Sequence, residues 1–599
     1  MSQVNDFVIN IATVNGSGSQ SANTILLKTL FRMGIPVGGK NVFPSNIQGL
    51  PTWFWVRASK KNYTGRRELA DIVVAMNPQT LLSDSKLVKT GGVLLYNSDM
   101  RFDLGNLRKD ILLVAVPIKQ IVDSVAAQGK IKKLLANIIY VGVLADLLEL
   151  DREILNSAIK DQFDGKESVV DVNQQALEKG LEYSKNYLKK ENFPYRAEKQ
   201  DEVNSQTKGK IMIDGNSAAA LGLICGGATF SAWYPITPSS SLVENFSKYA
   251  ALLRKTDDGK NKFAVVQAED ELASICMVLG AGWAGARSFT ATSGPGLSLM
   301  QEAIGYAYYA EIPSVIWDVQ RVGPSTGMPT RTAQADLLSS VFASHGDTKH
   351  PVLIPGTPGE CFEFGQVCFD LAERLQTLIF VLSDLDIGMN LWMEDEFKIS
   401  SKAYDRGKVL SEDELKKTTN YFRYQDVDGD GIPFRSLPGV KHPAAPYVVR
   451  GSGHNSKAQY TESGDEYLEV VDRLTVKWQT AKTLVPKPLI DQKKAKVSIV
   501  AYGSAESAIT EARDLLRKEG IETNYMRIRS IPFSLEVEQF LSEGQRIYLI
   551  DLNKDAQMLG ILKMELPQLG NQMISLRHYE GTPITADKIS EFVIKNERG

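Results

Sequence analysis

The sequence is poor in cysteine and histidine, and both shortages exclude classes of site. Its 599 residues include only four cysteines, Cys225, Cys276, Cys361 and Cys368, and no two form a C-x-x-C pair. Such rarity excludes a disulfide scaffold, and four-thiolate iron–sulfur clusters usually show closely spaced cysteines. We therefore expect four buried core thiols in a reducing, cytoplasmic setting. The five histidines form no H-x-x-x-H or H-E-x-x-H pair, so we expect no histidine-based catalytic metal site.

The sequence also lacks an excess of one charge and long apolar runs. Its 68 basic and 71 acidic residues give a net charge of −3, which provides no argument for binding nucleic acid or an anionic membrane. No apolar run reaches the roughly 18 residues typical of a transmembrane helix, and the N-terminus has no secretory-signal pattern. Hydrophobic residues make up 43% of the chain, so it can bury several cores and is not mainly disordered.

Strand-like and helix-like segments alternate in three parts of the chain, which predicts an α/β protein with three open, parallel-sheet units. The expected order is a first unit at 1–195, a polar linker at 196–210, a second unit at 211–390, an irregular connecting segment at 391–490 and a third unit at 491–599. The strands expected in the second unit lie at 229–234, 263–268, 287–292, 314–320 and 378–383.

A glycine-rich turn follows the first expected strand, residues 7–14. Gly16, Gly18 and Ser19 stand before an expected helix, so bare amides and a helix N-terminus could face an anion. Ser21 replaces the third glycine of the dinucleotide fingerprint, which disfavours NAD. The turn is either a structural strand-to-helix connection or a site for another nucleotide-bearing ligand.

Three aspartates alternate along the segment DVDGDG, residues 426–431, which is similar to the start of a calcium loop. An EF-hand requires a bidentate glutamate at loop position 12, where this chain has Leu437. The segment therefore either holds a cation in another geometry or forms an Asx/Gly turn. Its G-D-G also mimics the start of the diphosphate–Mg²⁺ motif of thiamine enzymes, but no buried strand is expected before it.

Two polar strand ends stand out between residues 230 and 274. In YPITPSSS, residues 234–241, the prolines leave Thr237 in rigid backbone beside a helix start, which suits a carboxylate or is a simple proline-rich cap. In QAEDELAS, Glu269 and Glu271 reach the start of a helix. Acidic residues there either stabilise the helix end or provide an acid–base group.

Two further strand ends follow. TATSGPG, residues 290–296, is another strand-to-helix turn, and QRVGPSTGMPT, residues 320–330, places Arg321 at the carboxyl end of a strand. Open α/β sheets bind ligands at that end, and the fork of a guanidinium suits an oxyacid.

Together these segments resemble the α subunit of 2-oxoacid:ferredoxin oxidoreductases, most closely the 2-oxoglutarate type with a small γ domain fused at its N-terminus. The resemblance rests on YPITPSSS, QAEDELAS, TATSGPGLSLM, QRVGPSTGMPTRTAQADL and LSDLDIGMNLWMEDEF, and it spans nearly the whole chain. It implies a γ-like first unit, a second unit similar to the pyrimidine-binding domain of thiamine enzymes and a third similar to a transketolase C-terminal domain. The turn NGSGSQSAN, residues 15–23, has fewer glycines than the corresponding turn of the family. The segment SNIQGLPTWFWVR, residues 45–57, is similar to the loop that follows that turn in the family.

The resemblance implies roles for individual residues. Glu271, with Glu269 as the alternative, matches the glutamate that contacts N1′ of thiamine diphosphate. Thr237 and Arg321 match residues that hold the 2-oxoacid head and act in catalysis. The other implied contacts are Pro238, Ser239, Gly294 and Gly296 for the cofactor, and Gly16, Gly18 and Ser19 for CoA. If the acid is 2-oxoglutarate, its distal carboxylate needs a second cation, because an unpaired buried carboxylate is costly. Arg331 is the first candidate and His345 the second, and the alternative is that Arg331 is a solvated helix residue.

The implied activity converts 2-oxoglutarate and CoA to succinyl-CoA, CO₂ and reduced ferredoxin, or the reverse. Because the chain has neither a credible diphosphate motif nor cluster cysteines, the resemblance assigns Mg²⁺, the cofactor diphosphate and a [4Fe–4S] cluster mainly to a β subunit, in an αβ or (αβ)₂ assembly. The alternatives are the same enzyme acting on pyruvate or branched-chain 2-oxoacids, half of another thiamine enzyme, and a non-catalytic nucleotide- or calcium-binding module.

Overall fold

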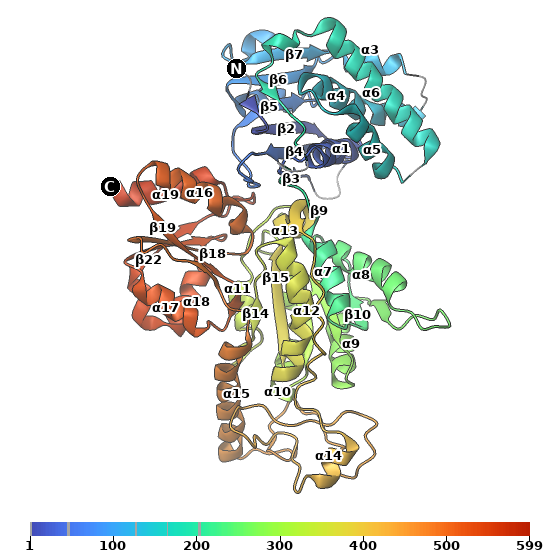
Figure 1. The fold of residues 1–599 in the computed structure, drawn as a ribbon. Coiled ribbons are helices and arrows are strands. Elements are labelled where there is room, and N and C mark those ends of the chain that lie inside the picture. The colour runs from blue at the N-terminus through green and yellow to red at the C-terminus, as the bar shows by residue number, and fades with distance from the viewer. Residues whose placement is uncertain (1–2, 45–47, 126–128, 165, 202–204, 599) are drawn as a thin grey trace.

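The computed structural model describes residues 3–44, 48–125, 129–164, 166–201 and 205–598. In that part of the chain, three larger sheets with helices packed against them form three α/β units (Figure 1). The α/β fold class expected from the sequence is therefore confirmed. The expected unit boundaries stay a prediction, and residues 202–204 of the expected linker lie outside the described residues.

The first unit contains a six-stranded sheet in the order β3-β4-β2-β5-β6-β7. The expected parallel order holds for β2, β5, β6 and β7, but β3 and β4 run antiparallel to their neighbours. The strands are β2 (Phe7–Val14), β3 (Val37–Val42), β4 (Pro51–Ala58), β5 (Ala70–Ala75), β6 (Val88–Asn97) and β7 (Leu112–Val116), and β1 (Gln3–Val4) pairs separately with β8 (Tyr195–Arg196).

Strand β4 corrects the expected loop at 45–57, of which residues 45–47 lie outside the described residues. It lies between β2 and β3, and most of its side chains are buried on both faces. A strand buried on both faces loses the alternation of apolar and polar residues that identifies strands in a sequence. The helices of this unit are α1 (Ser19–Arg32), α2 (Leu81–Lys86), α3 (Ile118–Asp123), α4 (Gly129–Leu147), α5 (Arg152–Gln162) and α6 (Glu167–Tyr187), with short 3-10 turns at Leu104–Asn106 and Lys190–Asn192.

The second unit contains a seven-stranded sheet in the order β11-β10-β12-β13-β15-β14-β20. All its neighbours are parallel except β20 (Ser530–Ile531), which comes from far along the chain and pairs antiparallel with β14. The other strands are β10 (Phe230–Trp233), β11 (Ala264–Gln267), β12 (Ser288–Thr292), β13 (Ser314–Gln320), β14 (Val352–Leu353) and β15 (Leu378–Asp384). The five expected strands coincide with β10, β11, β12, β13 and β15 to within one residue at each end.

Helices cover both faces of this sheet. They are α7 (Gly215–Cys225), α8 (Ser240–Leu253), α9 (Glu271–Trp283), α10 (Gly294–Ala310), α11 (Leu337–Val341), α12 (Pro358–Leu375) and α13 (Leu385–Met389), and β9 (Lys210–Ile213) pairs with β16 (Trp392–Asp395) beside them. Cys361 and Cys368 are buried on α12, but Cys225 is half-buried and Cys276 is exposed on α9. The expectation of four buried thiols is thus wrong for Cys276, because α9 turns this residue away from the sheet.

The third unit contains a five-stranded sheet in the order β17-β19-β18-β21-β22, parallel except for β17. The connecting segment before it holds α14 (Glu412–Lys417) and α15 (Gly464–Leu484), the latter close to the expected helix at 463–483. The elements of the third unit are β17 (Leu489–Asp491), β18 (Val497–Tyr502), α16 (Glu506–Lys518), β19 (Thr523–Ile528), α17 (Leu535–Glu543), β21 (Arg546–Asp551), α18 (Gln557–Glu565), β22 (Met573–Arg577) and α19 (Ala586–Arg598), with 3-10 turns at Gly503–Ala505 and Pro567–Gln572.

No helix among the described residues has both the length and the apolar content needed to cross a membrane.

Candidate active site

The carboxyl ends of the parallel strands in the second unit meet at the edge of the sheet that faces the first unit (Figure 1). Thr237 follows β10, Glu271 follows β11, Gly294 follows β12 and Arg321 follows β13. Because parallel strands end at a common edge, residues far apart in the sequence are brought together there. This edge is where most of the residues singled out in the sequence lie.

Glu271 is a buried carboxylate at this edge. It is the first residue of α9, and Asp270 caps the helix by accepting a hydrogen bond from the N–H of Ala273 at 2.7 Å. The side chain of Glu271 packs against the start of α10, where a Cβ added to Gly296 would lie 2.9 Å from Glu271 Cγ. Glycine is therefore required at this close approach of two helix ends. Glu269 is exposed, so Glu271 is the carboxylate that lines the interior.

Arg321 is buried at the end of β13 with 7% of its surface exposed. Its Nη1 donates a hydrogen bond to the carbonyl oxygen of Thr237 at 2.7 Å, and its Nε has no partner within the described residues. Burial lowers the pKa of Arg321 from its ordinary value, but a guanidinium stays charged at any physiological pH. The structure thus brings Arg321 and Thr237 together, although it is the backbone of Thr237 that touches the guanidinium.

Pro238 and Ser239 lie directly behind Thr237 and are buried. The side-chain amide of Asn216 donates to the carbonyl oxygen of Pro238 at 2.8 Å, which fixes the turn onto α7. Ser239 is the N-cap residue of α8, but its hydroxyl donates to the carbonyl oxygen of Ile236 instead of capping the helix. The turn is therefore held by buried polar contacts that the sequence alone did not indicate.

Two aspartates beside this site, the fully buried Asp318 and the half-buried Asp336, were missed by the sequence reasoning. Asp318 lies on β13 and Asp336 immediately precedes α11. A Cβ added to Gly294 would lie 2.9 Å from both carboxyl oxygens of Asp336, so this side chain packs against the start of α10. The available signal was a charged residue in the middle of an otherwise apolar strand.

Arg331 lies where the second unit meets the first. Its Nη1 donates to the carbonyl oxygens of Phe43 at 2.7 Å and of Thr330 at 3.0 Å. Burial lowers the pKa of this guanidinium from its ordinary value. The side chain therefore connects the loop that follows Arg321 to the segment after β3.

His345 is not brought together with Arg321. Its side chain is 83% exposed and lies 3.6 Å from the carboxylate of Glu302. Glu302 is eight residues into α10 from Gly294, which corresponds to about 12 Å along a helix. His345 instead lines a separate cavity of about 690 Å³ with aromatic residues of α10 and α15, including Tyr306 and Trp478.

The glycine turn of the first unit lines a cavity of about 400 Å³. Gly16, Gly18 and Ser19 all contribute to its wall, as do Asn41 and Phe43 from the end of β3 and just beyond it. Both glycines have positive φ angles, of 83° and 81°, which side chains other than glycine rarely adopt. Because Phe43 also accepts the hydrogen bond from Arg331, this cavity and the loop after Arg321 share a wall residue.

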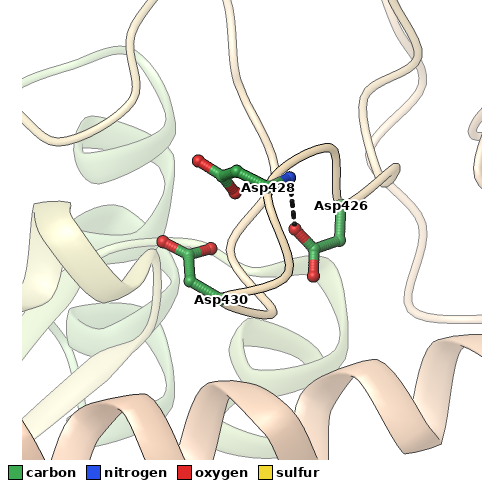
Figure 2. A group of neighbouring side chains, drawn as sticks. All are labelled: Asp426, Asp428 and Asp430. Carbon is green, nitrogen blue, oxygen red and sulfur yellow. Dashed lines mark hydrogen bonds between the residues drawn. The ribbon is translucent and has the colours of Figure 1, made fainter.

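The aspartate loop at 426–431 is an internally satisfied turn. Figure 2 shows the three carboxylates along the loop, with the N–H of Asp428 donating to Asp426. Their oxygens lie within 4.8 Å of one another, as in a cation site. However, the ammonium of Lys408 donates to Asp428 Oδ1 at 2.6 Å, to Asp430 Oδ1 at 2.7 Å and to the carbonyl oxygen of Ile432 at 2.8 Å. Lys408 therefore supplies the positive charge, which supports the Asx/Gly-turn interpretation.

This fold and edge define an α/β protein with a buried glutamate and a buried arginine at the carboxyl ends of parallel strands. The family model described as "Pyruvate flavodoxin/ferredoxin oxidoreductase, thiamine diP-bdg" matches residues 222–422, and the model "Pyruvate ferredoxin/flavodoxin oxidoreductase" matches residues 8–183. Subunit alpha of 2-oxoacid:ferredoxin oxidoreductase 2 from Aeropyrum pernix is 30% identical over 610 residues, covering 93% of each chain.

Two further similar proteins carry 2-oxoglutarate in their names. The 2-oxoglutarate synthase subunit KorA of Methanothermobacter marburgensis is 32% identical over 386 residues, covering 61% of this chain and 96% of that protein. A structure of 2-oxoglutarate:ferredoxin oxidoreductase from Magnetococcus marinus with 2-oxoglutarate, coenzyme A and succinyl-CoA bound superposes with a TM-score of 0.87 at 27% identity, covering 99% of both chains. The chain belongs to the family of 2-oxoacid:ferredoxin oxidoreductase α subunits. The enzyme class expected from the sequence is confirmed over a different thiamine enzyme or a non-catalytic module.

Proposed function

We propose that this chain is the α subunit, with a fused γ domain, of a 2-oxoglutarate:ferredoxin oxidoreductase. The complete enzyme converts 2-oxoglutarate and CoA to succinyl-CoA, CO₂ and reduced ferredoxin, or catalyses the reverse carboxylation. The observation that carries the proposal is the likeness over 99% of both chains to the Magnetococcus marinus structure with 2-oxoglutarate, CoA and succinyl-CoA bound. The buried pair of Glu271 and Arg321 at one sheet edge supports it chemically.

The residues around Glu271 fit the aminopyrimidine end of thiamine diphosphate. When bound, this cofactor supplies a carbon nucleophile for the 2-oxo carbon. Glu271 is buried at a helix start and is suited to hold a proton at N1′ of the ring. Gly294 and Gly296 leave the start of α10 without side chains, so a flat ring can approach its backbone. Pro238 and Ser239 would form the opposite wall.

Arg321 is the proposed clamp for the 2-oxoacid carboxylate. Its fork is pre-oriented by the carbonyl oxygen of Thr237, and its unpaired Nε leaves a donor for an incoming oxyanion. Because the site is buried, this charge-assisted hydrogen bond is strengthened relative to one in water. Thr237 and Arg321 therefore hold the 2-oxo carbon in place, while Glu271 holds the proton at N1′ of the aminopyrimidine ring.

The distal carboxylate of 2-oxoglutarate requires a second cation, because an unpaired buried carboxylate is costly. Arg331 is the proposed partner, since it follows Arg321 in the same loop and its guanidinium is half-buried between two units. His345 lies beside Glu302, which is about 12 Å along α10 from Gly294, and is left out of this pocket. Pyruvate lacks the distal carboxylate and would gain nothing from Arg331.

The cavity at the glycine turn is the proposed CoA site. Gly16, Gly18 and Ser19 present backbone beside the start of α1, an arrangement suited to phosphate groups. The contact between Arg331 and Phe43 connects this cavity to the substrate loop. Acyl transfer needs the CoA thiol to reach the substrate carbon, and the first unit lies over the carboxyl edge of the second sheet (Figure 1).

A β subunit is the proposed source of the diphosphate site, Mg²⁺ and a [4Fe–4S] cluster, in an αβ or (αβ)₂ assembly that passes electrons to ferredoxin in the cytoplasm. Among the described residues, the G-D-G segment is occupied by Lys408 and is no diphosphate motif. Leu272 and Met277 on α9 and Leu299 on α10 are exposed apolar side chains on the two helices whose starts meet at Glu271 and Gly296. We propose this face as the docking surface, because it would close the cofactor between the two subunits.

Co-expression with the candidate β subunit tests this proposal. The expected result is a brown complex that reduces a viologen dye with 2-oxoglutarate and CoA, and does so far more slowly with pyruvate or branched-chain 2-oxoacids. The chain purified alone should be colourless and inactive. A brown, iron-containing chain without a partner, or equal rates with mono- and dicarboxylic substrates, would contradict the proposal.

A further inference from the structure

Asp318 and Asp336 are two interacting carboxyl groups beside Arg321, with three of their four carboxyl oxygens buried. Asp318 is fully buried on β13, on the same face as Ile316 and Gln320. Three buried carboxyl oxygens, both of Asp318 and Oδ2 of Asp336, accept no hydrogen bond from any described residue. Such orphaned acceptors are costly in a native protein, so this arrangement needs a physical explanation.

A proton shared between the two carboxyls provides that explanation. Burial, followed by the adjacent Asp336, raises the pKa of Asp318 well above its ordinary value. Burial raises the pKa of Asp336 to about 6, while a hydrogen bond from Asp318 and the charge of Arg321 oppose this rise. Asp318 is therefore the protonated member and donates to the carboxylate of Asp336, as in other close carboxyl pairs.

Charged and polar side chains from the neighbouring strands and helices surround the pair. Arg321, three residues after Asp318, is the charged side chain that acts on both carboxyls. From β12, the neutral Thr292 lies opposite Asp318 in the sheet, and Gln320 accepts a hydrogen bond from the N–H of Asp336 at 3.1 Å. Glu271 lies on the far side of the α10 start, against Gly296. On β15, Leu382 lies opposite Asp318, and the fully buried carboxyl of Asp384 lies opposite Gln320. Asp384 accepts a hydrogen bond from Gln334 at 2.8 Å, and Arg321 is the cation that acts on both members of the pair.

We propose that Asp318 and Asp336 form a proton-sharing pair that supplies the counter-charge of Arg321 before substrate binds and gives up that charge, by taking a second proton, when a 2-oxoacid carboxylate reaches Arg321. With one shared proton, the pair carries one negative charge and Arg321 one positive charge. The substrate carboxylate adds a negative charge, and the proton taken up by Asp336 from solvent restores neutrality. The inference rests on the proposed function, because it takes Arg321 as the carboxylate clamp.

The charge of Asp336 makes substrate binding at Arg321 depend on pH. Above its pKa of about 6, Asp336 is ionised and repels the incoming carboxylate across Arg321. Substrate binding therefore weakens as the pH rises through that range. Both aspartates act through Arg321 and do not touch the reacting atoms, so they are positioning residues.

Two isosteric variants of the complete enzyme separate this role from simple packing. In the wild type, KM for 2-oxoglutarate should rise by on the order of tenfold between roughly pH 5.5 and 7.5. Asp318→Asn keeps a donor toward Asp336 and should retain that rise. Asp336→Asn keeps an acceptor without a charge and should abolish the rise, with kcat following the wild-type pH profile. An Asp336→Asn enzyme whose KM rises with pH as in the wild type would overturn the proposal.

An infrared measurement tests the shared proton without turnover. At neutral pH the wild-type protein should show the C=O stretch of a protonated carboxylic acid that is missing from Asp318→Asn. Identical spectra of the two proteins would contradict the proposal that Asp318 carries the shared proton. If no 2-oxoacid is turned over, the proposed function fails and the coupling to Arg321 fails with it. Turnover combined with an unchanged pH profile in Asp336→Asn overturns this inference alone.

Discussion

Lys40 of β3 and Asp386 of α13 form a buried ion pair between the first and second units, with the ammonium 2.8 Å from Oδ1 and 2.9 Å from Oδ2. Both side chains are almost fully buried, and Lys40 also lies 3.6 Å from the centre of the Trp392 ring. Burial lowers the pKa of the ammonium, and Asp386 opposes that shift. Together with the hydrogen bond from Asn41 N–H to Asn390, this pair fixes the first unit over the active-site edge.

Replacing Lys40 by Met should therefore destabilise the protein strongly. The substitution leaves Asp386 buried without its cation, which costs about 3–5 kcal/mol in comparable pairs. The double variant Lys40→Met, Asp386→Asn removes both charges and should recover most of the loss. Thermal unfolding of the three proteins measures this. Equal stability of Lys40→Met and the wild type would show that the pair does not hold the units together.

Arg331→Met tests the proposed recognition of the distal carboxylate. KM for 2-oxoglutarate should rise strongly, whereas KM for pyruvate or 2-oxobutyrate should change little. Steady-state kinetics with both classes of substrate measures the contrast. Because Arg331 also holds the carbonyl oxygen of Phe43, equal losses for mono- and dicarboxylic substrates would assign it to positioning the loop instead.

Lys408 should keep calcium out of the aspartate loop. Titration calorimetry of the wild-type chain with Ca²⁺ is expected to give no binding heat from this loop, because the ammonium already bridges Asp428 and Asp430. Lys408→Met should bind Ca²⁺ and gain thermal stability from it. Lys416→Met, which removes an exposed lysine of α14, is the matched control. Ca²⁺ binding by the wild-type loop would refute the interpretation of Lys408.

Glu311 should make stability depend on pH. Burial alone would raise its pKa, but Arg473 and Lys477 outweigh burial and hold the pKa of this carboxyl well below its usual value. A depressed carboxyl pKa contributes stability above the unfolded-state pKa of about 4.3, and that contribution disappears as the pH falls toward the folded-state value. Glu311→Gln should thus be markedly less stable than the wild type at pH 7, by about 3–5 kcal/mol.

Urea unfolding of Glu311→Gln and the wild type across acidic pH measures this difference. The difference should begin to shrink as the pH falls below the unfolded-state pKa of about 4.3, because the unfolded wild-type carboxyl then takes up a proton. It should continue to shrink toward the much lower folded-state pKa, where the folded carboxyl is protonated as well. A difference that is independent of pH would show that the loss arises from packing and not from the charge.

The sequence predicted the parallel strands well because their signal is local. β13 and β15 coincide with largely apolar runs, and the ends of β10, β11 and β12 carry the polar residues of the site. β4 was missed because both of its faces are buried, so no alternation remains to identify it. The sequence could not predict long-range contacts. Nothing local indicates that Lys408 binds the aspartates of the loop, that Asp336 interacts with Asp318, or that His345 lies beside Glu302 of α10.

The central claim is that Glu271 of this chain activates thiamine diphosphate in the complex with the β subunit. The most direct measurement is the rate of deuterium exchange at C2 of the bound cofactor, with cofactor occupancy determined in the same samples. Glu271→Gln should slow the exchange by about 10²–10⁴-fold at full occupancy, while Glu269→Gln, which changes an exposed carboxylate, should exchange like the wild type. Wild-type exchange in a fully loaded Glu271→Gln complex would contradict the account.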